Sequence, residues 1–401
     1  MEGEPPAPDG RSRSAGERGG APFLLQGEDH GTAPPPGRGA EPAAESRYAL
    51  VRRLSVLRGA DHAALAGRYA VVVGCGALGS AVAAHLVRGG VGRVRVVDRD
   101  VVEPRNLPHQ PLYTDQDAAG AELKADAAAT RLRTLNGGCR VDGVVADYAP
   151  DNALRLAAGA DVLIDGADNL ETKFLLNEVA LVTGTPLVHA GCAGTEGTVL
   201  AVVPRVTPCL RCLWPRPSPA AARTTCRTHG LLPATAAVVA ALQATEALKL
   251  LLRLPYRTLT GLVHADPWTA SLRRVPLPPR PDPRRPCPAC ERGELPYLGG
   301  PPPVASRALC GESTVLITAP VPPDRDELAR RHAANRTLRI RPGCLQLDLD
   351  GCRVVFYTSG RTLVHGAPDA DHARALYARL LGPPGPERAR PPAPGTERRP
   401  E

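Results

Sequence analysis

The stretch YAVVVGCGALGSAVAAHL, residues 69–86, decides the fold. A short apolar run enters a Gly-x-Gly-x-x-Gly turn at Gly74, Gly76 and Gly79, then continues as an alanine-rich helical pattern. Glycines at these spacings let backbone amides approach a phosphate at a helix N-terminus. The stretch therefore predicts a nucleotide-binding strand and helix, although a tight packing turn has the same pattern. Taken alone it does not distinguish NAD from ATP.

Strand and helix patterns alternate downstream of this turn. Apolar strand-like runs at VRVVDRD, CRVDGVV, DVLIDGAD and PLVHAGC are separated by longer helical patterns. Such alternation predicts an α/β fold, a Rossmann-like, doubly wound and mainly parallel sheet with helices on both faces. We expect this domain to occupy residues 46–295.

The rest of the chain divides into three kinds of segment. Residues 1–45 and 383–401 are rich in Pro, Gly and Arg without periodicity, which predicts disorder. Between residues 309 and 382, short strand patterns with Asp-Gly and Ser-Gly turns precede an amphipathic helix, which ends at Gly382. These features predict a small α+β domain, joined to the first by a linker at residues 296–308.

Charge and composition indicate which compartment and which partners to expect. The net charge is +8, but the basic residues are scattered and aromatic residues make up only 3% of the chain, so no nucleic-acid partner is expected. We expect no apolar run of membrane-spanning length, no signal peptide and no membrane partner. Eleven cysteines without an export signal indicate metal or thiol chemistry in the cytoplasm.

Two Cys-x-x-Cys pairs are the strongest single signal. Cys209 and Cys212 form one pair, and Cys287 and Cys290 form the other. Four thiolates in two such pairs predict a closed structural Zn²⁺ site that joins distant segments of the domain. The alternative, a redox-active Cys-x-x-Cys, needs only one pair and a thioredoxin-like context.

Acidic residues follow two of the expected strands. Asp98 ends the second strand, where it would bind ribose hydroxyls. Asp165 and Asp168 follow a later strand, where a carboxylate can hold Mg²⁺ on nucleotide phosphates. An equally weighted alternative is that Asp168 and Asn169 only cap the helix that begins near Glu171.

These motifs together resemble the E1-like adenylyltransferases, the ThiF and MoeB proteins and their molybdopterin-synthase sulfurylase relatives. The family's order of glycine turn, Asp-x-Asp, Asn-Leu-x-Arg-Gln, Lys, Asp-Asn, Cys-x-x-Cys, loop cysteine and Cys-x-x-Cys occurs between Arg47 and Cys290. The C-terminal segment resembles the small domain of some bacterial members and not a rhodanese domain. The resemblance favours ATP over NAD.

The resemblance implies an ATP·Mg²⁺ site and a homodimer. Lys124 would contact the phosphates, Asp168 would hold Mg²⁺, and Arg53 would reach the partner subunit's site. Asp98 would bind the ribose, and Asn106 keeps its place in the family motif. The full implied nucleotide site comprises Gly74, Gly76, Ala77, Gly79, Asp98, Asp100, Arg105, Asn106, His109, Lys124, Asp168 and Asn169.

One position departs from the family pattern. The arginine of Asn-Leu-x-Arg-Gln is His109 here. Arginine is always charged and clasps phosphate with two bonds, whereas histidine with its ordinary pKa near 6.5 is mostly neutral at pH 7. Arg105, four residues earlier, is the candidate for a compensating charge.

The resemblance also implies a substrate. The enzyme would adenylate the C-terminal glycine of a small ubiquitin-like sulfur carrier ending in Gly-Gly, for thiamine or molybdopterin synthesis. Cys226 would form a covalent sulfur-transfer intermediate, with a cysteine desulfurase or rhodanese as sulfur donor; the alternative is an inert loop thiol. Two other functions stay open: an E1-like enzyme acting on tRNA or a small molecule, and a scaffold that binds nucleotide or carrier without turnover.

Overall fold

The computed structural model describes most of the chain between residues 47 and 382. The predicted disordered tails and Cys226 lie outside the described residues. These are residues 47–57, 61–215, 229–254, 261–277, 286–299, 306–308, 314–319, 323–341, 343–358 and 360–382.

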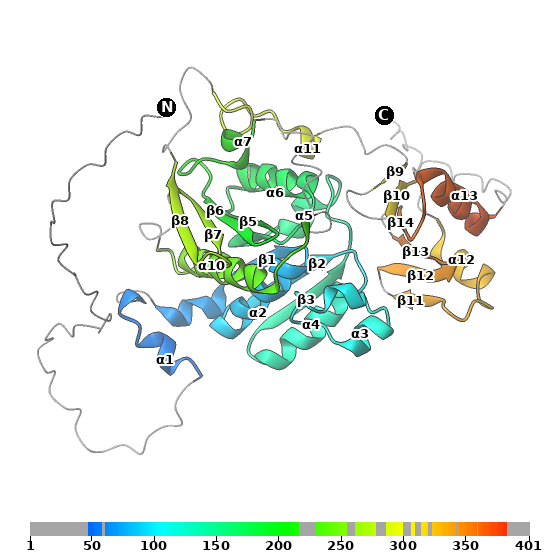
Figure 1. Cartoon of the computed structure of the whole chain (residues 1–401), viewed down its shortest axis with the longest axis horizontal. Coiled ribbons are helices and arrows are strands. Elements are labelled where there is room, and N and C mark those ends of the chain that lie inside the picture. The colour runs from blue at the N-terminus through cyan, green and yellow to red at the C-terminus, as the bar shows by residue number, and fades with distance from the viewer. Residues whose placement is uncertain are drawn as a thin grey trace, which may run out of the picture. The chain divides into compact units, whose positions relative to one another are not determined.

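The larger sheet has eight strands in the order β3-β2-β1-β4-β5-β6-β7-β8 (Figure 1). The first five in this order pair in parallel, as the alternating pattern predicts, and β6, β7 and β8 extend the sheet in antiparallel fashion. The strand order reverses between β1 and β4, the point at which doubly wound sheets bind ligands. The strands are β1 Tyr69–Val73, β2 Arg93–Asp98, β3 Arg140–Val145, β4 Val162–Asp165, β5 Leu187–Ala193, β6 Glu196–Val202, β7 Gly261–Asp266 and β8 Ser271–Pro276.

Helices cover both faces of this sheet (Figure 1). Strand β1 shows why: Ala70 and Val72 belong to one apolar cluster, and Val71 and Val73 belong to the other. Since successive side chains point to opposite faces, a wholly apolar strand needs cover on both. One cluster is shared with α2 Ala77–Gly89, α4 Lys124–Leu135 and α10 Pro233–Leu251, and the other with α5 Ala153–Ala157, α6 Leu170–Thr183, α7 Leu210–Leu213 and α11 Pro296–Gly299.

Shorter helical segments precede and connect these elements. Tyr48, just before α1, accepts a hydrogen bond from Asn136 Nδ2 at 2.8 Å and so ties the start of the described chain to the end of α4. The short elements are α1 Ala49–Arg52, η1 Ser55–Leu57, η2 His62–Gly67, η3 Pro104–Asn106 and α3 Asp115–Ala119.

Helix α10 corrects one expectation. Its 19 residues are long and apolar enough to cross a membrane by length and composition, so the prediction that no run approaches this length is wrong. Half of that apolar window is buried within the protein. Gln243 on this helix donates to the backbone carbonyls of Asp165 and Val188, both at 2.8 Å. These contacts are those of a core helix, which must be apolar because it packs between α2 and the sheet.

The second sheet confirms the predicted C-terminal domain. Its strand order is β11-β12-β13-β14-β10-β9, and all its pairs are antiparallel. The Asp350-Gly351 turn has φ of +52° and +74°, as a two-residue hairpin turn requires, and the last helix ends at Gly382. The elements are β9 Ser306–Ala308, β10 Thr314–Thr318, α12 Arg325–Arg331, β11 Arg339–Arg341, β12 Cys344–Leu349, β13 Cys352–Tyr357, β14 Arg361–His365 and α13 Ala370–Leu381.

Ordered elements fall inside the range 296–308 that the sequence predicts as a linker. Helix α11 packs on α6, where Tyr297 stacks on Phe174 with ring centroids 5.3 Å apart. Strand β9 pairs with β10. Short segments of this kind carry too few residues for a periodic pattern to reveal them.

Candidate functional site

The glycine turn joins β1 to α2 at the strand-order reversal. Gly74 has φ of +85°, and a Cβ there would lie 2.5 Å from the carbonyl oxygen of Gly166. A Cβ at Gly79 would lie only 1.8 Å from the carbonyl oxygen of Gly74. These two motif glycines are therefore required by the close packing of β1, α2 and the end of β4. The packing-turn alternative accounts for them in full.

Gly76 has a different environment. Its φ is −83°, and the nearest atom to a Cβ there would be Nε2 of Gln110, at 3.8 Å. Protein packing therefore does not require glycine at this position. Gly76 is also the N-cap of α2, where the first turn, with Ala77, presents backbone amides without helical partners. Space at a 13-residue helix N-terminus fits a phosphate group.

Asp98 braces the turn from the end of β2. Its Oδ2 accepts from the backbone N–H of Cys75 at 2.6 Å, and its Oδ1 accepts from that of Asp100 at 2.7 Å. Burial raises the pKa of Asp98 to about 6, against the opposing charge of Lys124. Asp98 thus orients the glycine turn and keeps acceptor lone pairs for a ribose hydroxyl.

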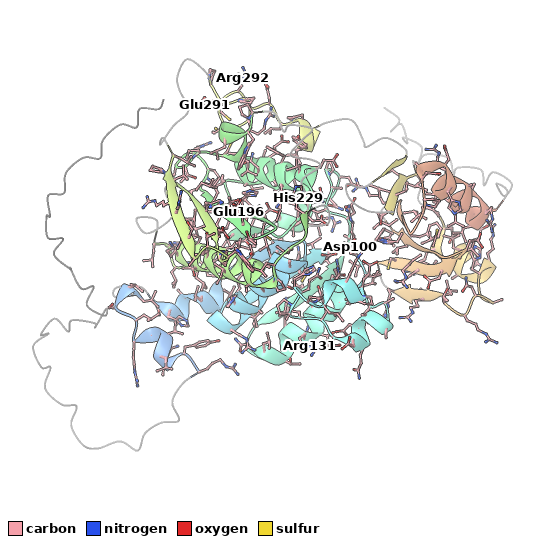
Figure 2. All side chains as sticks on the ribbon, in the orientation of Figure 1. Asp100, Arg131, Glu196, His229, Glu291 and Arg292 are labelled. Carbon is pink, nitrogen blue, oxygen red and sulfur yellow. The ribbon has the colours of Figure 1, made fainter. Side chains whose placement is uncertain are left out.

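Lys124 and Asp100 form an ion pair beside the turn. Nζ of Lys124 lies 3.2 Å from Oδ2 of Asp100, and the lysine side chain is 9% exposed. Burial alone would lower the pKa of Lys124, but Asp100, Asp98 and Asp168 hold it above its usual value, so the ammonium stays charged. Figure 2 shows Asp100 just beyond the end of β2. A charged ammonium at the carboxyl edge of the sheet is suited to neutralising a phosphate.

The structure separates the acidic residues that follow β4. Asp168 is exposed, and its charge acts on Lys124 and on Arg99. Asn169 caps α6, because its Oδ1 accepts from the backbone N–H of Thr172 at 2.9 Å. The capping alternative therefore holds for Asn169. Asp168 does not carry the cap, and its exposed carboxylate fits a hard cation such as Mg²⁺.

Asp165 is not available to a metal. It is fully buried, with Nδ1 of His189 2.6 Å and Nζ of Lys173 3.2 Å from its Oδ2. Burial would raise the pKa of Asp165, but Lys173 and His189 hold it below its usual value. The motif analysis missed Lys173 and His189, because they meet Asp165 only after β4, α6 and β5 pack together. The three residues brace the strand that delivers Asp168.

The segment after β2 contains further residues that were predicted to contact the nucleotide. Asn106 closes a capping box with Glu103 around η3, and Arg105 pairs with the same Glu103 at 2.5 Å. His109 is half-buried, and burial together with Lys124 lowers its pKa. At neutral pH the imidazole is therefore uncharged, and the positive charge of Arg105 is directed to Glu103.

Arg53 is exposed at the carboxyl end of α1. That position leaves its side chain accessible to a second subunit. Cys226 lies outside the described residues, so its role stays a prediction from the sequence.

The four predicted zinc ligands come together. The Sγ atoms of Cys209, Cys212, Cys287 and Cys290 all lie within 4.8 Å of one another, with measured separations of 3.6–3.7 Å. Tetrahedral Zn²⁺ with bonds of about 2.3 Å needs sulfurs about 3.8 Å apart, so the cluster fits the ion.

Neighbouring groups hold both cysteine loops in place. Oδ1 of Asn177 on α6 accepts from the backbone N–H of Leu210 at 2.9 Å. Oε2 of Glu291 accepts from that of Cys287 at 2.6 Å, and Figure 2 shows Glu291 and Arg292 in the loop near α7. The cluster thus joins residues 209–212 to residues 287–290 and anchors both to α6. All four cysteines share one site, which favours a metal site over separate redox pairs.

Comparison with known proteins decides the family. The model of the ThiF family matches residues 49–289. The chain belongs to the ThiF family. The "Sulfur carrier protein ThiS adenylyltransferase" of Bacillus subtilis is 34% identical over 325 residues, which cover 78% of this chain and 92% of that protein. These matches identify the chain as an ATP-dependent adenylyltransferase.

Two further relatives have related names. The "Sulfur carrier protein adenylyltransferase" of Thermus thermophilus is 40% identical over 226 residues, 55% of this chain and 81% of that protein. The "Adenylyltransferase and sulfurtransferase MOCS3" of Mus musculus is 34% identical over 303 residues, 72% of this chain and 63% of that protein. This ThiF-family chain is therefore similar to adenylyltransferases from bacteria and from an animal.

Proposed function

We propose that this protein adenylates the C-terminal glycine of a small ubiquitin-like sulfur carrier, for thiamine or molybdenum-cofactor synthesis. The main support for this proposal is that Gly76, Lys124 and Asp168 all lie at the carboxyl edge of the sheet. Relatives of the chain are also named for this activity. No dehydrogenase function explains this site together with the four-cysteine cluster.

The reaction needs positioning and charge neutralisation more than covalent chemistry from the protein. A carboxylate oxygen of the carrier's terminal glycine forms a bond to the α-phosphorus of ATP. The bond from that phosphorus to the bridging oxygen breaks, and pyrophosphate leaves. The products are the carrier acyl-adenylate and pyrophosphate.

Residues of this chain divide the work. Backbone amides of the first turn of α2, with Ala77, would hold phosphate, and Asp98 would hold the ribose. The Lys124 ammonium would neutralise charge on the phosphates, with Asp100 orienting it. Asp168 would hold Mg²⁺, which supplies further charge neutralisation when bound.

Two further parts of the proposal rest on family resemblance, and a third rests on the cysteines. Arg53 would complete the site of a second subunit in a homodimer, which its exposure at the end of α1 permits. Cys226 would take part in the later sulfur transfer from a desulfurase or rhodanese donor. The cytoplasm is the proposed compartment, since zinc thiolates and free cysteines suit a reducing environment.

ATP–pyrophosphate exchange tests this function. With a ThiS-type carrier ending in Gly-Gly, we expect exchange that disappears in Asp168→Ala and when the carrier lacks its last glycine. Asp371→Ala is the control, because Asp371 is an exposed aspartate on α13 that pairs locally with Arg374, outside the proposed phosphate site. Exchange without carrier, or full exchange by Asp168→Ala, would contradict the assignment.

A scaffold that binds nucleotide without turnover is the second candidate. The uncharged His109 at the position of the family's arginine favours it. ATP binding without exchange under any carrier would select the scaffold over the enzyme.

A further inference from the structure

A buried ion pair unused by the proposed chemistry lies between the two sheets. Arg361 on β14 donates from Nη1 to Oδ2 of Asp147 at 2.6 Å. The two side chains are 6% and 7% exposed. Asp147 follows β3, at the same carboxyl edge of the larger sheet as Asp98. Burying a charged side chain costs free energy unless the charge is paired. Solubility depends on exposed charges, so it does not explain this buried contact.

The pair is one end of a chain of alternating charges. Oδ1 of Asp147 accepts from Nη1 of Arg99 at 2.6 Å. Nε of Arg99 lies 3.7 Å from Oδ1 of Asp100, whose Oδ2 pairs with Lys124. Burial would raise the pKa of Asp100, but Lys124 and Arg99 hold it below its usual value. Five charged groups thus connect β14 to the proposed phosphate-binding lysine.

Apolar packing seals the same boundary. Val101 and Leu123, each next to a member of this chain of charges, form one buried cluster with residues of the smaller sheet. The hydroxyl of Tyr357 on β13 donates to the backbone carbonyl of Arg99. The smaller-sheet members of the cluster are Leu316, Cys344, Val355, Tyr357 and Leu363.

We propose that the C-terminal sheet is part of the adenylation site, and that Arg361 is a positioning residue for ATP. By holding Asp147, Arg361 fixes Arg99, which in turn holds the Asp100 carboxylate that orients the Lys124 ammonium. Without Arg361, Asp147 and Arg99 would pair differently, and Asp100 would lose one of the cationic groups that act on it. The inference rests on the proposed role of Lys124 at the phosphates.

Calorimetric titration with ATP tests it without any carrier. We expect Arg361→Gln to weaken ATP binding by about tenfold, the scale of one charge-assisted hydrogen bond. Arg361→Lys should recover part of the loss, because it restores the charge with a single donor. The control is Arg379→Gln, which removes an exposed ion pair with Asp350 (2.7 Å) in the same domain and should leave the affinity unchanged.

A double variant and the melting temperature distinguish a positioning role of Arg361 from a purely structural one. Because Arg361 acts through Asp147, the double variant Arg361→Gln/Asp147→Asn should lose no more affinity than the worse single variant. Wild-type ATP affinity in Arg361→Gln, or a lower melting temperature with unchanged affinity in the folded fraction, would overturn the inference. Should Arg361→Gln fail to fold, Tyr357→Phe, which removes only the hydroxyl on Arg99, takes its place with the same two outcomes.

Lys124→Ala in the same titration separates the two proposals. Unchanged affinity in that variant would overturn the role of Lys124 and the inference with it. Weakened binding in Lys124→Ala with wild-type binding in Arg361→Gln would overturn the inference alone.

Discussion

His109 is the position where this chain departs from its family at the level of a single side chain. Burial and the nearby Lys124 lower its pKa, so the imidazole is neutral above pH 6.5. We predict that His109→Arg tightens ATP binding at pH 8 by about tenfold, since hydrogen bonds to charged groups contribute about 1.5–3 kcal/mol. The measurement is calorimetric titration with ATP at several pH values from 8 down to 5.

The sign of the pH effect follows from the same histidine. As the pH falls through the lowered pKa of His109, the wild-type side chain gains charge, so the advantage of His109→Arg should shrink. Asp98, with its pKa of about 6, titrates in both proteins, and the ratio of their affinities cancels its contribution. A ratio that stays constant from pH 8 down to pH 5 would contradict the role given to His109.

A variant of Arg105 tests whether this arginine compensates for the loss of the family's arginine at position 109. Its guanidinium pairs with Glu103 at 2.5 Å, and its side chain is half exposed. We predict that Arg105→Ala leaves ATP affinity within about twofold of wild type, because exposed pairs contribute little. A tenfold loss in the same titration would show that Arg105 replaces the family's arginine.

The turn between β1 and α2 makes a prediction at the scale of an element. A Cβ at Gly76 would meet its nearest neighbour at 3.8 Å, whereas one at Gly79 would collide with the Gly74 carbonyl at 1.8 Å. Gly76→Ala should therefore keep its melting temperature and lose ATP affinity, because the methyl group fills the space left for phosphate. Gly79→Ala should instead lower the melting temperature. Thermal melts and ATP titrations of both variants check this, and equal behaviour would refute the division of roles.

The cysteine cluster joins two chain segments that are 78 residues apart in sequence at their first ligands. We predict one zinc per chain by elemental analysis, with Cys290→Ser losing the metal. Its melting temperature should fall by roughly 10 °C, at about 2–4 °C per kcal/mol for a domain of this size. Cys352→Ser, a buried cysteine of the smaller sheet, is the control that should keep its zinc. Full zinc in Cys290→Ser would contradict the four-thiolate site.

At the scale of the whole molecule, the features that sequence patterns predicted are those determined by interactions between neighbouring residues. The glycine turn, the apolar strand β1 and the Asp350-Gly351 hairpin were readable because each depends on a few adjacent residues. The four cysteines were readable because thiolate spacing is specific for zinc. Strands β7 and β8 were not predicted, since they take their place only by pairing with β6.

Contacts between residues that are far apart in the sequence could not be predicted from it. Asp165 looked like a metal ligand until packing placed Lys173 and His189 on it. The same holds for Arg361, which is 214 residues from Asp147. Helix α10 has the composition of a membrane span, and only its position against the sheet shows it to be a core helix.

The most direct test of the central claim is the mass of the carrier after reaction. A ThiS-type carrier is incubated with the protein, ATP and Mg²⁺, and its intact mass is measured together with the released phosphates. The account predicts that the carrier gains one AMP and that pyrophosphate is released, both lost in Asp168→Ala. A carrier of unchanged mass, or one that gains a phosphoryl group with release of ADP, would contradict it.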